Sequence, residues 1–302
     1  MSGLRTGVIG LGAMGAPMAR HLAHKGFLEG VWNRTAGKAN RLARELGTWV
    51  AGSPAELASR CDVLLVCVSA DQDLESVVEQ CLPGLRKGAV LVDTSTVGPG
   101  TTVALAEKLA GNGVSYADAP VSGGVEGAIN GRLVSMVGAD LATFERIQPV
   151  IESFSASVTH MGPVGSGQAA KAVNQVIVAG VAEAVCEALA LAEKLNLPRE
   201  RLLSVLSSGA ADGWFLRHRG RSMMENRFEK GFKQSLLLKD LEIIRALARE
   251  LDIPMPGVEA ARRDYAVLVA RGEGDNDISG LIRKKRSDAR QNEETGEAAG
   301  TA

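Results

Sequence analysis

The sequence predicts an α/β protein, with a doubly wound, mostly parallel sheet followed by an all-helical second domain. Three observations support this prediction. A glycine-rich segment at residues 10–15 separates the apolar run 7–9 from the amphipathic stretch 16–25. Strand-like and helical stretches then alternate through the first half, which is typical of parallel sheets with helices on both faces. Beyond about residue 165 the strand signal disappears and helical periodicity remains.

The expected elements follow one another with short connections. After the strand at residues 7–9, strands are expected at 28–32, 63–68, 90–93, 115–117, 133–137 and 158–160. Helices are expected between them at 16–25, 36–46, 54–59, 71–80, 100–110 and 141–154. The helical half begins with one long alanine-rich helix over 168–195, which Asn196-Leu197-Pro198 ends, and continues over 199–206, 235–251 and 257–271.

These elements predict two domains and a tail. The chain has 302 residues, which is enough for two domains. We expect an α/β domain over residues 1–163 and an all-helical domain over 164–286. Residues 287–302 are polar and rich in Glu, Gly and Ala, so they lack the apolar side chains needed for packing and are expected to be disordered.

The composition argues against several classes of partner. A net charge of −1 and an aromatic content of 4% favour neither nucleic acid nor an anionic membrane surface. The most apolar stretch, residues 173–192, is interrupted by Glu183 and Glu187, so it is interpreted as a buried helix and not as a membrane span. The basic run 283–286 is interpreted as a solvated helix end, with a nucleic-acid patch as the alternative.

The cysteines and the N-terminus indicate the compartment. No metal-ligand spacing is present among Cys61, Cys67, Cys81 and Cys186, so buried reduced thiols are expected, with no metal site and no disulfide framework. No N-terminal targeting segment is visible, because the first strand begins within the first few residues. A cytoplasmic protein is therefore expected.

The glycine-rich segment Gly10-Leu11-Gly12-Ala13-Met14-Gly15 has the G-x-G-x-x-G spacing of a dinucleotide-binding turn. Gly10 permits the tight turn, Gly12 lets the backbone approach a pyrophosphate, and Gly15 lets the helix pack on the strand. The helix N-terminus then offers unpaired N–H groups to the phosphates. This spacing also occurs by chance, so the flanking strand and helix are what favour a Rossmann-type site at residues 10–15.

The end of the second strand indicates which dinucleotide is bound. In NAD sites an acidic residue about 20 residues beyond the glycines accepts a hydrogen bond from the ribose 2′-OH. Here the strand ends in Trp32-Asn33-Arg34-Thr35, without a carboxylate. Asn33 and Thr35 can hydrogen-bond a 2′-phosphate, and Arg34 can pair with it. NADP(H) is therefore expected in preference to NAD(H), and an ordinary exposed turn is the alternative.

Further segments extend the pattern. Asp118-Ala119-Pro120-Val121-Ser122-Gly123-Gly124 closes a strand with small residues, residues 165–174 (GSGQAAKAVN) open the long helix, and Lys239-Asp240-Leu241 lies in the helical half. With the glycine turn and Asp93-Thr94-Ser95-Thr96, the chain resembles the β-hydroxyacid dehydrogenase family over about residues 5–285. This family is 6-phosphogluconate dehydrogenase-like and includes 3-hydroxyisobutyrate dehydrogenase and tartronate semialdehyde reductase.

Lys171 is the candidate proton donor. On a helix it shares a face with Asn174, three residues further on. It lies near the helix N-terminus among small residues, with no carboxylate within four residues, where its charged form is disfavoured. An ammonium there could protonate a carbonyl oxygen that gains charge during hydride transfer, and the amine could take the proton back in the reverse direction. From the residues alone a surface lysine is an equal alternative; the resemblance implies that Lys171 is the catalytic lysine.

The resemblance also implies the other site residues. In the family a small-residue loop and a helix asparagine hold the substrate carboxylate, which assigns this role here to Ser122, Gly123, Gly124 and Asn174. Successive small residues suit an anion because they expose backbone N–H groups. Residues implied along the cofactor and at its nicotinamide end are Val68, Ser69, Thr96 and Lys239. Residues 212–216 could line the substrate pocket, or they could form a packing cluster at a helix start.

The expected function is an NADP-dependent oxidoreductase that interconverts a small carboxylate-bearing aldehyde, of the semialdehyde or glyoxylate type, and its hydroxy acid. Tartronate semialdehyde (2-hydroxy-3-oxopropionate) reductase and 3-hydroxyisobutyrate dehydrogenase are the favoured activities. A non-catalytic cofactor-binding or assembly module of the same fold and an imine reductase relative are the alternatives; Lys171 argues against both. The apolar stretch 173–192 predicts a homodimer or homotetramer joined through the helical domains.

Overall fold

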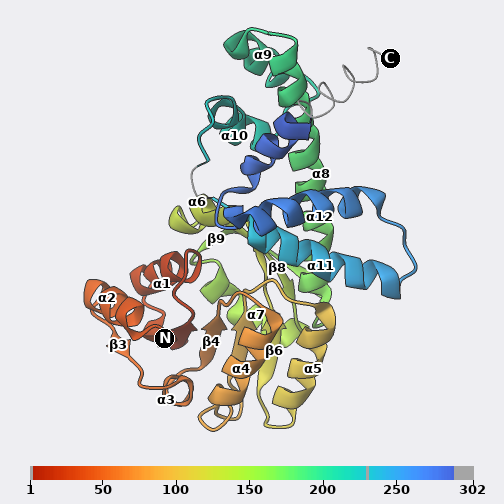
Figure 1. Ribbon diagram of the computed structural model, residues 1–302. Coiled ribbons are helices and arrows are strands. Elements are labelled where there is room, and N and C mark those ends of the chain that lie inside the picture. The colour runs from red at the N-terminus through yellow and green to blue at the C-terminus, as the bar shows by residue number, and fades with distance from the viewer. Residues whose placement is uncertain (1–2, 229–230, 289–302) are drawn as a thin grey trace. The chain divides into compact units, whose positions relative to one another are not determined.

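A computed structural model describes residues 3–228 and 231–288 (Figure 1). The chain divides into two compact units, Met1–Val173 and Asn174–Ala302. This division falls ten residues after the boundary expected at residue 163, because the first turns of the long helix α8 (Ser166–Lys194) pack with the sheet of the first unit.

The first unit is built on a nine-stranded, mostly parallel sheet. Its strand order is β3 (Trp49–Val50), β2 (Leu28–Trp32), β1 (Thr6–Ile9), β4 (Val63–Val66), β5 (Val90–Asp93), β6 (Ser115–Asp118), β8 (Leu133–Gly138) and β7 (Val121–Ser122), and β9 (Ser155–Gly162) also pairs with β8. The pairs from β3 to β6 are parallel, whereas β8 runs antiparallel to β6 and β7. The predicted doubly wound fold is confirmed.

Helices cover both faces of this sheet. They are α1 (Gly15–His24), α2 (Ala36–Leu46), α3 (Pro54–Ala58), α4 (Asp71–Cys81), α5 (Pro99–Ala110), α6 (Gly124–Ile129) and α7 (Leu141–Ile151). Adjacent residues of β4 alternate between two apolar clusters: Leu65 packs with side chains from α1 and α2, and Leu64 with side chains from α3, α4 and α5. Because successive strand residues face opposite sides, a strand covered on both faces is apolar throughout.

Several expected boundaries in the first unit are wrong. β4 ends at Val66, so residues 67 and 68 belong to a loop and not to the end of a strand. β9 begins at Ser155, three residues earlier than expected. α7 ends at Ile151 and not at residue 154, because the Ser153 hydroxyl donates to the Val150 carbonyl (2.7 Å) and competes with helical continuation. β3, β7 and α6 were not expected; the two strands, of two residues each, are too short to show a periodic pattern.

The second unit is helical over its described residues. Besides α8, it contains α9 (Arg199–Leu206), α10 (Trp214–Met224), α11 (Gln234–Glu250), α12 (Pro256–Leu268), a π-helical turn (Val269–Glu273), a 3₁₀ turn (Ile278–Gly280) and helical residues 281–288. Ser287 and Asp288 therefore belong to a helix, contrary to the expected tail, and the remaining tail residues, 289–302, lie outside the described residues. α10 was not among the expected helices, although a helix start at residues 212–216 was one of the two interpretations of that segment.

The basic run 283–286 is packed against the unit and is not a solvated helix end. Lys285 donates to Glu187 (3.0 Å) and Asp264 (2.7 Å) and also pairs with Glu183. Burial raises the pKa of Glu183, and the Lys285 ammonium opposes that shift. The charges that interrupt the apolar stretch of α8 are thus paired with the last described helix, about 100 residues away in the sequence.

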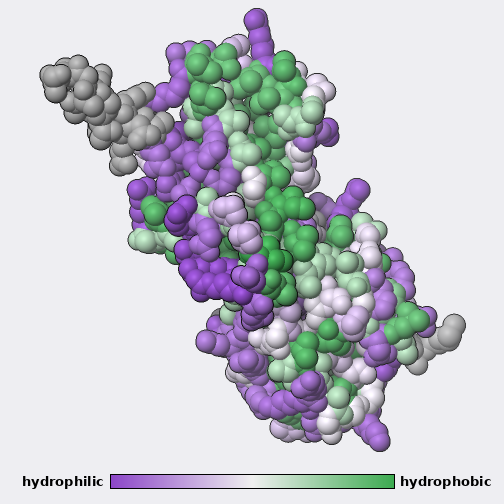
Figure 2. Space-filling model, turned by 90° about the vertical axis from the view of Figure 1, so that its right-hand side faces the viewer, coloured by the Kyte–Doolittle hydropathy of each residue, from purple (hydrophilic) through white to green (hydrophobic). Residues whose placement is uncertain are grey.

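The expectation that residues 173–192 are buried holds for only one face of α8. Ala179, Ala182 and Leu189 are buried, whereas Ile177 is 61% exposed, and further exposed apolar side chains are Val173, Val181 and Leu191. By length and composition alone α8 could also cross a membrane, a test that the core helices of soluble proteins pass as well. Figure 2 shows apolar surface on the side of the molecule where α8 lies in Figure 1.

Candidate functional site

The glycine turn between β1 and α1 has the geometry that a dinucleotide requires. Gly10 has a φ of +91°, and a Cβ there would lie 2.0 Å from the Cys67 carbonyl oxygen. A Cβ on Gly15 would lie 1.9 Å from the Gly10 carbonyl oxygen, so helix and strand approach closely. At Gly12, in contrast, a Cβ would meet nothing within 4 Å. The turn therefore packs tightly at its first and third glycines and is open at the second, where a pyrophosphate would approach.

Asn33 holds this turn in place. Its side-chain oxygen accepts a hydrogen bond from the Leu11 N–H (2.8 Å), and its amide nitrogen donates to the Thr35 carbonyl (3.1 Å). The expected role of Asn33 toward a 2′-phosphate is therefore joined by a structural one, which the sequence does not signal because residues 11 and 33 are distant in the chain.

Arg34 lies at the carboxyl end of β2 beside an acidic residue of α4. Its side chain is 86% exposed, and its guanidinium lies 3.1 Å from Asp73. Thr35 precedes α2 and makes no side-chain capping bond. The expected absence of a carboxylate at the end of β2 holds for the strand itself, but the fold brings Asp73 beside Arg34.

The residues present fit a nicotinamide dinucleotide. They lie at the carboxyl ends of adjacent parallel strands, where doubly wound sheets bind such ligands. The first turn of α1 contains no acidic residue, so its N-terminus is compatible with phosphate. Val68, after β4, donates its N–H to the Ser95 hydroxyl (2.9 Å), which joins the loops that follow β4 and β5.

Two buried carboxylates end the neighbouring strands β5 and β6. Asp93 and Asp118 are register partners, and neither is exposed. Asp93 accepts hydrogen bonds from the Ser95 N–H (2.9 Å) and the Tyr116 hydroxyl (3.3 Å). Burial raises the pKa of Asp93 to about 7, and the nearby Asp118 contributes to this rise. Both acids belong to segments that carry the family resemblance, residues 93–96 and 118–124, but their burial and pairing follow only from the sheet register.

Asp118 anchors the start of α8. Its carboxylate accepts hydrogen bonds from the N–H groups of Gly165 and Gln168, both at 2.8 Å. A Cβ on Gly167 would lie 2.8 Å from this carboxylate, so only glycine permits the approach. Burial raises the pKa of Asp118, and the two N–H groups oppose that rise.

Lys171 lies in the second turn of α8 and is buried. The residue is 7% exposed, and its Nζ donates a hydrogen bond to the Val121 carbonyl (2.9 Å). The alternative of a surface lysine is therefore wrong. Val121 immediately precedes Ser122, so the structure brings the candidate proton donor next to the candidate carboxylate-binding loop.

That loop has the open backbone expected of an anion site. Ser122 ends β7, and Gly123 and Gly124 have φ angles of +121° and +62°, a region that side-chain-bearing residues rarely adopt. A Cβ on Gly124 would meet nothing within 4 Å. N–H groups of such a turn are available to a carboxylate.

In the second unit, Asn174 and Lys239 are connected through two residues that were not assigned roles. The Asn174 amide donates to the Gln175 side-chain oxygen (2.7 Å), and the Gln175 amide donates to Asp240 (2.8 Å). Lys239 pairs with the same carboxylate at 3.1 Å. Asp240 therefore fixes the direction of the Gln175 amide, and through it the direction of the Asn174 amide.

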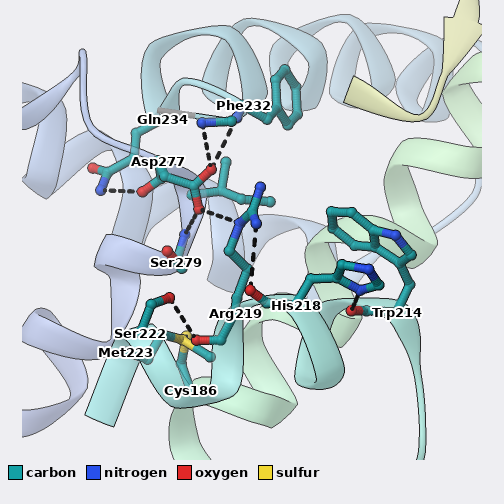
Figure 3. A network of polar contacts seen from close by, with 12 residues as sticks. Cys186, Trp214, His218, Arg219, Ser222, Met223, Phe232, Gln234, Asp277 and Ser279 are labelled. Atoms are coloured by element: carbon teal, nitrogen blue, oxygen red, sulfur yellow. Dashed lines mark hydrogen bonds and ion pairs between the residues drawn. The ribbon is translucent and has the colours of Figure 1, made fainter. Parts of the chain in front are cut away.

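A second polar network of this unit includes Trp214, one residue of the segment 212–216 (Figure 3). Asp277, almost fully buried, accepts hydrogen bonds from the Phe232 N–H (2.9 Å) and pairs with Arg219 (3.4 Å). The Arg219 guanidinium lies over the ring of Trp214, which stacks on His218. Trp214 is exposed whereas Phe215 is buried, so segment 212–216 contains both a packing residue and a surface aromatic.

The described residues contain no group of three or more His, Cys, Asp or Glu side chains placed to hold a metal ion. The glycine turn and the doubly wound parallel sheet together define a dinucleotide-binding protein.

Comparison with known proteins gives the family. Residues 5–162 match the NAD binding domain of 6-phosphogluconate dehydrogenase, and residues 165–284 match the NAD-binding domain of NADP-dependent 3-hydroxyisobutyrate dehydrogenase. The 2-hydroxy-3-oxopropionate reductase of Escherichia coli K12 is 34% identical over 282 residues, 92% of this chain and 96% of that protein. The chain belongs to the β-hydroxyacid dehydrogenase family and is an NAD(P)-dependent hydroxyacid dehydrogenase.

Solved structures agree with this assignment. The 3-hydroxyisobutyrate dehydrogenase of Mycobacterium tuberculosis with L-serine has a TM-score of 0.85 and 29% identity, covering 94% of this chain and 99% of that one. A structure of Psf3 in complex with NADP+ and 2-OPP has a TM-score of 0.84 and 26% identity, covering 92% of this chain and 99% of that one.

Asp93→Asn should flatten the pH dependence of stability. Because the pKa of Asp93 is raised from 3.8 to about 7, the folded protein keeps a proton that the unfolded chain loses, and stability falls as pH rises from about 4 to about 7. Its full contribution is at most about 4 kcal/mol, three pKa units at 1.36 kcal/mol each. Asp118, Tyr116 and Cys67 face this site and remain, so part of the slope persists.

Urea unfolding of both proteins at pH 5 and pH 8 measures this effect. The exposed Glu107→Gln serves as the control and should keep the native slope. An Asp93→Asn protein that loses as much stability between these pH values as the native protein would show that Asp93 does not titrate there.

Proposed function

We propose that this protein is an NADP-dependent reductase of a small carboxylate-bearing aldehyde, with Lys171 as the general acid and base. The observation that supports it most directly is the buried Lys171 amine, held by the Val121 carbonyl beside the open loop Ser122–Gly124. The bound nicotinamide supplies or accepts the hydride. In reduction Lys171 gives a proton to the carbonyl oxygen, and in oxidation it removes the hydroxyl proton.

The carboxylate of the substrate is assigned to Ser122, Gly123, Gly124 and Asn174. The loop offers N–H groups and one hydroxyl, and Asp240 and Gln175 orient the Asn174 amide. A carboxylate held at one end of a short substrate places the aldehyde at a fixed distance from it, which restricts the substrate to small molecules.

We further propose 2-hydroxy-3-oxopropionate reduction or 3-hydroxyisobutyrate oxidation as the particular reaction. The names of the E. coli reductase and the M. tuberculosis dehydrogenase support this choice. A panel of tartronate semialdehyde, methylmalonate semialdehyde, glyoxylate and succinic semialdehyde, with the corresponding hydroxy acids and each nicotinamide cofactor, identifies the substrate by kcat/KM.

The retained Lys171 disfavours the non-catalytic module and the imine reductase, because both alternatives were expected to lack this lysine.

Lys171→Ala should lower kcat by about 10²–10⁴, the usual range for general acid–base catalysis. Cofactor affinity should remain, because the phosphate-binding turn at residues 10–15 is a separate part of the unit. Lys171→Arg should not restore activity, since guanidinium stays protonated and cannot take the hydroxyl proton. Turnover of aldehyde by Lys171→Ala at near-native rate would contradict the assignment.

Ser122→Ala should act mainly on KM, because its expected partner, the substrate carboxylate, is remote from the reacting carbon.

Arg34→Ala should weaken NADPH binding by about 1–2 kcal/mol and leave NADH binding nearly unchanged, because an exposed charge-assisted contact with the 2′-phosphate is lost. Asp73→Asn is the matched variant: it removes the carboxylate that competes for Arg34, so NADPH should bind more tightly. Titration calorimetry with both cofactors measures these changes. Equal or better catalytic efficiency of the native protein with NADH would overturn the NADP preference.

We also propose a homodimer or homotetramer in which the exposed apolar face of α8 packs against a second copy. Ile177, Val181 and Leu191 lie on this face and stay exposed in the single chain. Apolar surface of this kind is typical of subunit interfaces. Light scattering at micromolar concentration should give a dimeric or tetrameric mass, and Ile177→Lys should lower it. A monomeric native mass is the contrary result.

A further inference from the structure

The side-chain amide of Gln168 binds the main chain of the loop that follows β5. Gln168 is the third residue of α8 and is 2% exposed. Its amide nitrogen donates to the Ser95 carbonyl (2.8 Å), and its oxygen accepts from the Val97 N–H (3.3 Å). These two groups belong to the peptide units on either side of Thr96. A single amide therefore fixes both peptides of that residue.

Gln168 is itself anchored to the sheet. Its N–H donates to the buried carboxylate of Asp118 (2.8 Å), which also holds the Gly165 N–H. One helical turn further on, Lys171 donates to the Val121 carbonyl (2.9 Å). The same stretch of α8 thus joins the Thr96 loop to the candidate proton donor.

The loop is held from its other side as well. The Ser95 N–H donates to Asp93 (2.9 Å), and the Ser95 hydroxyl accepts from the Val68 N–H (2.9 Å). Ser95 and Val97 are both buried, whereas Thr96 is partly exposed. Without the Gln168 amide, a buried carbonyl and a buried N–H would lose these partners, and the loop would have to move to replace them.

We propose that Gln168 is a positioning residue that fixes Thr96 at the nicotinamide end of the cofactor and couples this loop to the helix start that carries Lys171. The inference rests on the proposed function and on the place of Thr96 at the nicotinamide end of the cofactor, which the family resemblance implies. Gln168 acts through the main chain of residues 95–97. A side chain in this role needs one donor and one acceptor side by side, which the glutamine amide provides.

The test compares two ligands that differ at the nicotinamide end. Adenosine 2′,5′-bisphosphate carries the adenosine and 2′-phosphate of NADPH but no nicotinamide. Gln168→Met keeps the length and volume of the side chain and removes both hydrogen bonds. In titration calorimetry its Kd for NADPH should rise about tenfold, while its Kd for the bisphosphate should change by less than about twofold. KM for NADPH should rise, with a smaller fall in kcat.

A matched control separates this effect from lost stability. Gln234→Met removes another fully buried glutamine amide, which donates to the Asp277 carbonyl (3.1 Å) in the second unit. It should lower the melting temperature as Gln168→Met does, yet keep the native ratio of the two Kd values. A Gln168→Met protein with the native ratio would overturn the proposal.

Gln168→Asn gives a second arm if the methionine variant does not fold. It keeps the amide but is one methylene shorter, so it cannot reach both peptides of Thr96 and should show the same selective loss of NADPH affinity. A native Kd ratio in this variant would also overturn the proposal. Failure of the proposed function is recognised separately, as native protein that binds NADPH but reduces none of the aldehydes of the panel.

Discussion

The hydrogen bonds between the Asp118 carboxylate and the start of α8 are the constraint on which the site of the first unit depends. A fully buried carboxylate is costly unless its oxygens accept good hydrogen bonds, and here the N–H groups of Gly165 and Gln168 supply them at 2.8 Å. The resulting position of the helix start determines where both Gln168 and Lys171 lie. Gly138 and Gly167 leave the space for this contact, since a Cβ on either would meet the carboxylate.

Asp93, beside Asp118 on the next strand, adds a second buried acid to the same edge of the sheet. Two carboxylates in register oppose each other's ionisation, and burial raises the pKa of both. Polar groups that reduce stability are typical of functional sites, and these two acids hold the loops at residues 95–97 and 165–168.

In the second unit, partly buried charges are stabilised by ion pairs. Glu183 and Glu187 interrupt the apolar stretch of α8, and both pair with Lys285 of the last described helix. Near Asn174, the buried Asp240 pairs with Lys239 and orients the Gln175 amide. Glu183, Glu187 and Asp240 each have a partner from another helix, so the packing of this unit is directional as well as apolar.

The sequence by itself determined the order and type of the long elements. Periodicity is a local property, so β1, β2, β4 and β5, the helices between them and α8 could be predicted to within a few residues. The glycine turn was predictable for the same reason, because its chemistry lies within six consecutive residues. Lys171 was singled out from its local surroundings, but only the resemblance to a family distinguished it from a surface lysine.

Only the tertiary structure decided which distant groups meet. The pairing of Asp93 with Asp118 depends on strand register, and the contact of Asn33 with Leu11 depends on two adjacent strand ends. The hydrogen bonds of Gln168 to the peptides on either side of Thr96 depend on the approach of α8 to the sheet. The two-residue strands β3 and β7 were also decided there, since they form by pairing with longer strands, and the short helix α6 was not expected either. Contacts between residues 22 to 73 positions apart leave no periodic pattern in a sequence, because their geometry exists only once the chain has folded.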